Sequence, residues 1–254
     1  SSIVISGTPI TRPNGQTLPL GKENPIFGPS NLLDFELEMG CFIGPGNDIG
    51  KPISIENASD HLFGLVLVND WSARDIQKWE YVPLGPFLAK NLATSISPWV
   101  IPFEALERFR IENPIQDNPE PMSYLQSNEK WTFDMHLEVQ IKTPKLSVPE
   151  TICRSNYKHM YWNVAQQLAH HTITGCNMKP GDMFASGTIS GEKPSSYGSM
   201  LELAWKGTKP IQLSSGEERK FIQDHDTIIM TGYGQGQGYR VGFGEASGTI
   251  LPAI

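Results

Sequence analysis

The amino-acid sequence predicts one α+β domain in which β-strands predominate. Short apolar runs are separated by Gly, Pro, Asn and Asp along most of the chain, and only two stretches have a clear helical period. No internal repeat or low-complexity linker divides the 254 residues, of which 39% are hydrophobic and 19% are charged. A chain of this length can bury a substantial core, so residues 1–254 are expected to form a single domain.

Three strands are predicted in the first part of the chain. Residues 1–30 are rich in Gly, Pro and Asn, which is typical of loops, around one strand at Ile3–Ile5. From Leu33 to Ile43, polar and apolar residues alternate as in a strand with two different faces. The continuous apolar run from Leu62 to Val68 is typical of a buried strand.

A short helix is predicted directly after the buried strand. Ser72 and Asp75 have the Ser-x-x-Asp spacing of a capping box, in which side chains bind the free backbone groups at a helix start. Pro83 and Pro86 are expected to end this helix, because proline lacks an N–H group and its ring collides with the preceding turn.

The second half of the chain is predicted to contain one long strand, one helix and a hairpin. Asn113–Pro121 has the composition of an exposed insertion, and Trp131–Lys142 alternates strictly, as a half-buried strand does. The apolar spacing in Asn156–His171 predicts an amphipathic helix that closes at Gly175. Gly232–Gly238 resembles a phosphate-binding loop in composition, but a strand pattern follows it, which favours a hairpin or a bulge.

Composition excludes several classes of partner. The formal net charge is −7 and the sequence pI is about 5.4, so nucleic acid is not expected to bind, and an anionic substrate would need local positive charge. Three widely spaced cysteines suggest neither a disulfide framework nor a zinc site, which favours the cytoplasm. The longest apolar run, Leu62–Val68, is far shorter than a bilayer requires, and no secretory leader is evident, so no membrane association is expected.

Two glutamates on one predicted strand are the first candidate metal ligands. Glu36 and Glu38 project from the same side, roughly 7 Å apart, since successive side chains alternate. Two such carboxylates repel each other unless a cation or a shared proton lies between them. Hard oxygen ligands suit Ca²⁺, Mg²⁺ or Mn²⁺. The alternative is a solvated strand face with no ligand.

The segment that follows the buried strand is the second candidate region. Asp70 ends an apolar strand, where a bare carboxylate is costly unless it is paired or bound to a metal. Arg74, Gln77 and Tyr81 fall on one helical face and could form a receptor for a carboxylate and a carbonyl. Lys90 follows an apolar stretch and could be a partly buried cation. The alternative is an ordinary amphipathic helix with a polar outer face.

A set of longer motifs runs across essentially the whole chain. It comprises Glu36-x-Glu38, Asn69–Gln77, Trp79–Phe87, Met160–Trp162, Gly181-Asp182, Ala185–Gly191, Gly198–Leu203 and Trp205–Pro210. Together these motifs resemble the fumarylacetoacetase (fumarylacetoacetate hydrolase) family. The resemblance implies the C-terminal catalytic domain of that family, a mixed β-sandwich roll, a homodimer, and hydrolysis of 4-fumarylacetoacetate, a small anionic diketo acid, to fumarate and acetoacetate in tyrosine and phenylalanine catabolism.

The resemblance also implies a role for individual residues. Those matching the family's Ca²⁺ ligands are Glu36, Glu38 and Asp70, and those matching its Mg²⁺ site are Asp70, Lys90 and Thr94. Those matching substrate contacts are Arg74, Gln77, Tyr81 and Thr188. Glu202 matches the carboxylate that orients the general base, and Lys90 is expected to share the charge on the departing acetoacetate. An ammonium is a poor Mg²⁺ ligand, so Lys90 is expected to contribute its backbone carbonyl to that site.

The family's general-base histidine, a fourth carboxylate ligand and two tyrosines match positions upstream of Ser1. None of the six histidines present matches that base, so residues 1–254 alone are expected to be inactive. Two alternatives remain open. The chain could be an acylpyruvate hydrolase or decarboxylase of the wider superfamily, or a metal-binding pseudoenzyme that lacks a base.

Overall fold

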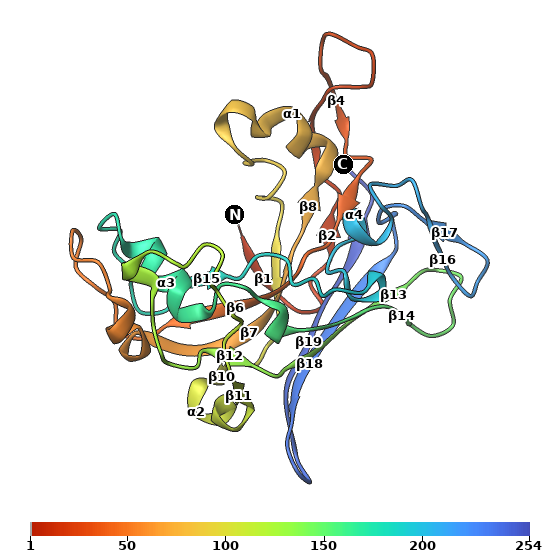
Figure 1. The fold of residues 1–254 in the computed structure, drawn as a ribbon. Coiled ribbons are helices and arrows are strands. Elements are labelled where there is room, and N and C mark those ends of the chain that lie inside the picture. Colours follow the sequence, from red (N-terminus) through yellow and green to blue (C-terminus); the bar gives the residue numbers. More distant parts are fainter. Residues whose placement is uncertain (1) are drawn as a thin grey trace.

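A computed structural model describes residues 2–254, and two mixed β-sheets dominate it (Figure 1). The six-stranded sheet contains β1 (Ile3–Ile5), β6 (Leu37–Ile43), β7 (Leu62–Asp70), β9 (Thr94–Ile96), β10 (Ile101–Pro102) and β15 (Met183–Ala185). The five-stranded sheet contains β2 (Ile10–Thr11), β13 (His136–Lys142), β14 (Glu150–Asn156), β18 (Thr227–Gln235) and β19 (Arg240–Leu251). One parallel pair in each sheet, β1–β9 and β19–β2, accompanies antiparallel neighbours. The fold is therefore the β-rich mixed roll that the sequence predicts.

Short strand pairs and helices surround the two sheets. The two-stranded pairs are β3 (Asn14–Thr17) with β4 (Ile26–Pro29), β5 (Leu33–Asp34) with β8 (Ser72–Ala73), β11 (Arg110–Ile111) with β12 (Thr132–Phe133), and β16 (Ile211–Gln212) with β17 (Glu218–Arg219). The α-helices are α1 (Arg74–Leu84), α2 (Phe103–Leu106), α3 (Val164–Thr172) and α4 (Met200–Leu203). The 3-10 helices are η1 (Ile55–Asp60), η2 (Glu107–Phe109), η3 (Ser123–Leu125), η4 (Tyr157–His159) and η5 (Pro194–Ser196). Helix α1 and the β3–β4 hairpin project together away from the sheets (Figure 1).

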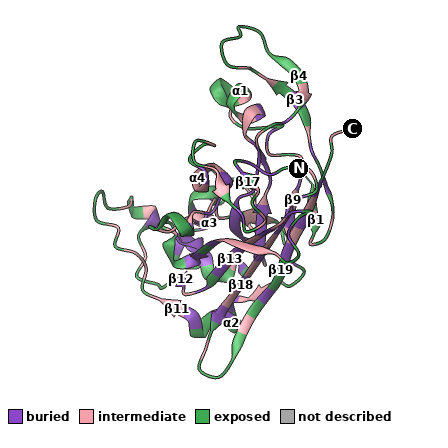
Figure 2. Cartoon of the chain, turned by 90° about the vertical axis from the view of Figure 1, so that its right-hand side faces the viewer, coloured by how far each residue is buried: buried purple, intermediate pink, exposed green. Residues whose placement is uncertain are grey.

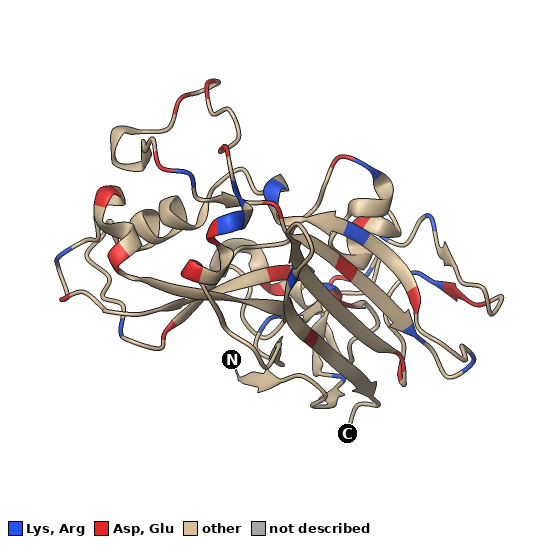
Figure 3. Ribbon diagram, turned by 90° about the horizontal axis from the view of Figure 1, so that it is seen from below, with Lys and Arg blue, Asp and Glu red and all other residues tan. Residues whose placement is uncertain are grey.

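The core lies where the two sheets face each other, and buried residues follow the strands (Figure 2). Gly232 on β18 is held between Leu137 of its own sheet and Leu67 of the other, and a β-carbon there would lie 3.1 Å from Leu67 Cδ2. Leu67 and Met230 are both fully buried in one cluster that joins the sheets. Acidic and basic residues are interspersed over strands and loops (Figure 3).

Two predicted strands are each interrupted, which corrects the sequence analysis. The segment Leu33–Ile43 divides into β5 and β6, because Glu36 donates its backbone N–H to the Asn69 side chain, 3.2 Å away, instead of to a neighbouring strand. It is also buried on both faces over most of its length. Similarly, Trp131–Lys142 divides into β12 and β13, because the Asp134 N–H turns to the carbonyl of Phe109.

The helix predicted over Asn156–His171 begins later, at Val164. Asn156 ends β14, and its side chain accepts a hydrogen bond from the backbone of Lys158. The true start is a reciprocal capping box between Asn163 and Gln166, whose spacing the sequence contains. The prediction placed the helix too early because it followed the apolar spacing and overlooked this cap.

The capping box predicted at Ser72 and Asp75 is also wrong. Ala73 precedes α1 without any side-chain cap, and the Asp75 carboxylate accepts hydrogen bonds from Ser30 Oγ and the Asn31 backbone, at 2.6 and 2.7 Å. The predicted end of the helix is close to the observed one, since Val82 leaves helical dihedral angles directly before Pro83. Asp75 thus ties α1 to the segment before β5.

The remaining predictions concern less regular segments. Residues 1–30 contain the four strands β1–β4 where the sequence predicts one. Asn113–Pro121 is exposed or half-buried and lacks regular structure, as predicted. The glycine-rich segment Gly232–Gly238 belongs to the β18–β19 hairpin, whose register shifts between Thr231 and Tyr233, which confirms the hairpin prediction. Within residues 2–254, no helix has the length and apolar character to cross a membrane.

Candidate functional site

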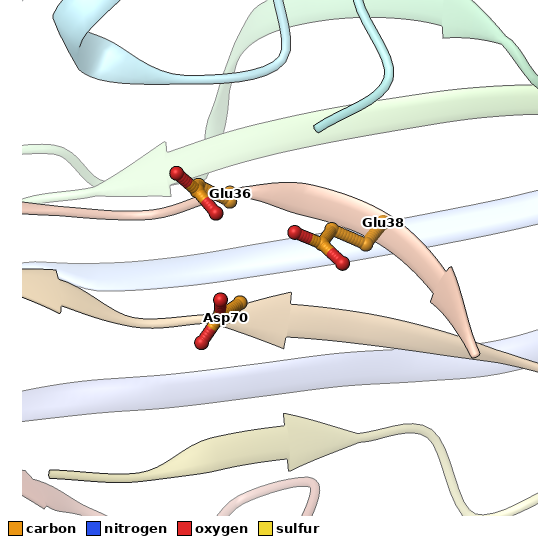
Figure 4. A group of neighbouring side chains, drawn as sticks. All are labelled: Glu36, Glu38 and Asp70. Carbon is orange, nitrogen blue, oxygen red and sulfur yellow. The ribbon is translucent and has the colours of Figure 1, made fainter. Parts of the chain in front are cut away.

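Adjacent strands bring the predicted carboxylates together. Glu36 directly precedes β6, Glu38 lies within it, and Asp70 ends the antiparallel neighbour β7. The Asp70 backbone N–H donates to the Glu36 carbonyl at 3.2 Å, which brings the two backbones side by side. One carboxylate oxygen from each of the three residues lies within 4.8 Å of the others, and the side chains gather in one place (Figure 4). The three acids that the family resemblance groups together are therefore close neighbours in the structure.

Two cations lie beside these carboxylates. Lys90 Nζ donates to Glu36 Oε2 at 2.5 Å and to Asp70 Oδ2 at 2.7 Å, and its side chain is 21% exposed. Arg74 Nη1 lies 2.8 Å from Glu36 Oε1, while its Nε donates to Asp34 Oδ2, also at 2.8 Å. The prediction that Lys90 is a partly buried cation is confirmed. Its ammonium lies inside the carboxylate cluster.

The pKa values show where the negative charge is least compensated. Burial, together with the charges of Asp70 and Glu36, raises the pKa of Glu38 to about 8. Burial also raises the pKa of Asp70, in spite of the opposing charge of Lys90. Burial acts in the same direction on Glu36, but Lys90 and Arg74 together outweigh it and lower the pKa of Glu36. Glu38 therefore keeps its proton near neutral pH unless a cation takes the proton's place beside Asp70.

The donor set fits a hard divalent cation. Four carboxyl groups, those of Asp34, Glu36, Glu38 and Asp70, meet only Arg74 and Lys90, which leaves a formal charge of −2 when all four are ionised. Oxygen ligands of this kind suit Ca²⁺, Mg²⁺ or Mn²⁺. Thr94, predicted to belong to a second site, is the direct partner of Asp70 in the β7–β9 ladder. Its position is compatible with that role.

A cleft of about 450 Å³ opens beside the cluster. Two of the four predicted substrate contacts, Arg74 and Thr188, line it, whereas Gln77 and Tyr81 do not. Its walls include Glu36, Arg74, His159, Tyr161, Trp162, Thr188 and Glu202. The Glu202 carboxylate is fixed there, since Oε2 accepts hydrogen bonds from Ser190 Oγ at 2.8 Å and from Ser199 Oγ at 2.9 Å. A carboxylate held by two hydroxyl groups is oriented, which suits the role predicted for it.

The receptor predicted on the α1 face is only partly assembled. Gln77 Oε1 accepts a hydrogen bond from Arg74 Nη1 at 3.2 Å, so these two side chains are joined as expected. Tyr81 is 53% exposed, and its hydroxyl has no hydrogen-bond partner among residues 2–254. Arg74 is 9% exposed and largely occupied by carboxylates. Spacing alone predicts a free receptor, but in the structure the Arg74 guanidinium is already paired with Asp34, Glu36 and Gln77.

Sequence reasoning missed two acidic residues that organise the site. Asp34 is fully buried and is the first of three acids that alternate as Asp34, Glu36 and Glu38 along the chain, a signal that was available. Glu80 on α1 accepts hydrogen bonds from the backbone N–H groups of residues 87, 88 and 89, at 2.8, 3.1 and 2.9 Å. It thereby fixes the loop that leads to Lys90. No sequence pattern indicates that contact.

Comparisons with known proteins agree with this geometry. Residues 1–247 match the family described as fumarylacetoacetate (FAA) hydrolase C-terminal. The chain is 58% identical to the fumarylacetoacetase of Homo sapiens and 60% identical to that of Dictyostelium discoideum, and in both cases 100% of the chain aligns with 60% of the relative. It thus spans about 60% of the length of these curated relatives.

Solved structures show the same fold at low sequence identity. A fumarylacetoacetate hydrolase from Exiguobacterium antarcticum superposes with a TM-score of 0.59 at 20% identity, covering 99% of this chain and 63% of that one. A fumarylpyruvate hydrolase from Pseudomonas aeruginosa, in complex with Mn²⁺ and pyruvate, gives a TM-score of 0.52 at 16% identity, covering 98% and 74%.

The mixed β-roll and its acidic cluster place the chain in a class of β-rich domains that have a candidate divalent-metal site beside an open cleft. More particularly, the chain belongs to the fumarylacetoacetate (FAA) hydrolase C-terminal family.

Proposed function

We propose that the protein hydrolyses 4-fumarylacetoacetate to fumarate and acetoacetate, the last step of tyrosine and phenylalanine breakdown. The relatives named fumarylacetoacetase, at 52–60% identity over essentially the whole chain, support this substrate. The single structural observation that carries the proposal is that Glu36, a member of the three-carboxylate cluster, lines the same cleft as the paired Arg74 and the oriented Glu202. These groups suit a small anionic diketo acid.

The carboxylates Glu36, Glu38 and Asp70 would hold Ca²⁺ in this proposal, with Mn²⁺ as an alternative. Mg²⁺ would bind at Asp70, Lys90 and Thr94. When bound, a divalent cation supplies Lewis-acid polarisation of a substrate carbonyl. The clustering of the three carboxylates and the formal charge of −2 support the first of these sites. The pairing of Thr94 with Asp70 supports the second.

Side chains of the cleft, together with those of helix α1 and Lys90, would position the substrate and stabilise charge. Arg74, Gln77, Tyr81 and Thr188 would hold its carboxylate and carbonyl oxygens. Of the three N–H donors of the Lys90 ammonium, two bind Glu36 and Asp70, so the third remains for the enolate oxygen of departing acetoacetate. Glu202 would orient a histidine from outside residues 1–254, which takes the proton of the attacking water.

Two copies of the chain are proposed to associate as a homodimer, as the family resemblance implies. Sedimentation of the full-length protein at micromolar concentration tests this. A species of twice the chain mass is expected, and a monomer over the whole concentration range would contradict the proposal.

The function is tested by turnover of the full-length protein with two substrates, fumarylacetoacetate and an acylpyruvate. We expect hydrolysis of the first, with Glu202→Gln lowering kcat by about 10²–10⁴-fold, the usual contribution of general-base catalysis. Glu218→Gln, at the exposed position of β17, is the matched control and should leave kcat unchanged. Faster turnover of the acylpyruvate would overturn the substrate assignment, and metal binding without turnover of either would indicate a pseudoenzyme.

A further inference from the structure

Asp34 is the most deeply buried acid around the cleft, and it has four hydrogen-bond donors. Its side chain is 0% exposed. Oδ1 accepts from the backbone N–H groups of Phe35 at 2.8 Å and Met200 at 2.7 Å. Oδ2 accepts from Leu201 N at 3.1 Å and from Arg74 Nε at 2.8 Å. Each carboxylate oxygen therefore receives two donors, and none of its capacity is left for solvent or substrate.

These donors belong to the two segments that carry the chemistry. Met200 and Leu201 open α4, the short helix on which Glu202 lies. Arg74 opens α1, and its Nη1 contacts Glu36 and Gln77. Asp34 is thus the one carboxylate, among the described residues, that binds both the arginine and the start of α4. Asp34 is therefore the direct link between Arg74 and the helix that carries Glu202.

A purely structural role is the alternative, and the molecule contains a matched example of it. Arg219 and Asp226 form a second buried Arg–Asp pair, with side chains 4% and 0% exposed. Its other side-chain contacts are to Glu217 and to the backbones of Glu218 and Gln223, and none of these residues lines the cleft. Buried ion pairs of this kind contribute little net stability over apolar residues. The two pairs are similarly buried. They differ in the segments that they connect, because only the Arg74–Asp34 pair connects residues of the cleft.

We propose that Asp34 is a positioning residue of the hydrolase: it fixes the Arg74 guanidinium and the first turn of α4 in one arrangement, so that Arg74 and Glu202 face the substrate together. The proposal rests on the proposed function. Asp34→Asn keeps the shape of the side chain but turns an N–H₂ group toward at least one of its present donors. Arg74 and α4 then lose their common anchor, while the candidate metal ligands Glu36, Glu38 and Asp70 are not substituted, and saturating metal offsets any change in their affinity.

The experiment compares Asp34→Asn with Asp226→Asn in the full-length protein at saturating metal. We expect Asp34→Asn to lower kcat/KM by at least 50-fold, while Asp226→Asn changes it by less than threefold even where it lowers the melting temperature. In an Arg74→Met background, Asp34→Asn should raise KM by less than threefold, because its effect on binding acts through Arg74. A folded Asp34→Asn protein with normal kcat/KM, or equal losses in both variants, would overturn the proposal.

A second measurement needs no substrate and separates this proposal from the proposed function. Hydrogen exchange at the amides of Met200 and Leu201 should accelerate at least tenfold in Asp34→Asn and remain unchanged in Asp226→Asn. Absence of turnover in the wild type would contradict the proposed function alone. Unchanged exchange at both amides would overturn the positioning role whatever the reaction is.

Discussion

Two largely buried ionic clusters in this molecule have similar geometry but differ in how completely their charges are compensated. The site cluster consists of Asp34, Glu36, Glu38, Asp70, Arg74 and Lys90. The hairpin cluster, near the β16–β17 pair, consists of Glu217, Arg219 and Asp226. In both, a nearly buried arginine lies 2.8 Å from an aspartate whose side chain is 0% exposed.

In the hairpin cluster, every charged side chain has hydrogen-bond or ion-pair partners within the protein. Arg219 binds both oxygens of Asp226, at 2.8 and 2.9 Å, and Glu217 accepts hydrogen bonds from Thr143 and Ser215. Those hydroxyl groups, that of Thr143 first, and Arg219 lower the pKa of Glu217 to about 2. In the site cluster, burial and two like charges raise the pKa of Glu38 to about 8. The comparison separates a cluster in which every carboxylate is paired from one in which Glu38 is uncompensated and must bind either a proton or a cation.

The largest expected effect in this comparison is on folding, and it belongs to the hairpin cluster. Arg219→Met leaves Asp226 buried without its cation, which typically costs about 3–5 kcal/mol. Chemical denaturation of the full-length protein measures that loss. Metal affinity of the folded fraction should not change, because none of the three candidate ligands contacts Arg219. A loss of metal affinity without a loss of stability would erase the distinction between the two clusters.

The next prediction concerns the site cluster, where a substitution should weaken metal binding without lowering the stability of the fold. Glu38→Gln removes one ligand charge and should lower Ca²⁺ or Mn²⁺ affinity at least tenfold, about 1.4 kcal/mol. The stability of the metal-free protein should stay the same or rise by up to about 1 kcal/mol, because Gln is neutral without the proton that a buried Glu38 must take up on folding. Calorimetric titration and denaturation measure the two quantities, with exposed Glu107 changed to Gln as the control. Unchanged affinity would refute the ligand assignment.

The site was predictable where chemistry follows the local pattern of the chain. Alternation along the strand placed Glu36 and Glu38 on one face, and an acid at the end of an apolar run identified Asp70. The anchor at Asp34 was not found, because its partners Met200 and Leu201 lie 166 and 167 positions away in the sequence. Contacts of that range depend on the sheet arrangement, which no local period encodes.

The fold shows the same division between local and distant causes. The strand at Leu62–Val68 and the hairpin at Gly232–Gly238 were predicted, since apolar runs and glycine turns act locally. The interruption at Glu36 was not, because it depends on the Asn69 side chain from a neighbouring strand. The late start of α3 is different, since its cap at Asn163 and Gln166 is a local signal that apolar spacing obscured.

The smallest effect concerns Glu80, which acts on the site cluster from a distance through Lys90. Its two oxygens accept three backbone N–H groups, from residues 87, 88 and 89, and Lys90 follows directly in the chain. Glu80→Gln keeps one acceptor oxygen and turns an amide N–H₂ toward the remaining donor. The loss should be about 1 kcal/mol, since one charged hydrogen bond is exchanged for an unfavourable contact.

That loss of free energy should destabilise the loop at residues 87–89 and leave the stability of the whole fold nearly unchanged. We expect kcat/KM to decrease about fivefold, because Lys90 spends part of the time away from Glu36 and Asp70, while the melting temperature changes little. Hydrogen exchange at the amides of residues 87–89 should accelerate by a similar factor. The exposed acid Glu104 on α2, changed to Gln, is the control for removing a surface charge. Faster exchange with unchanged kcat/KM would show that the loop does not position Lys90, and the site cluster would then depend on Asp34 and the strands alone.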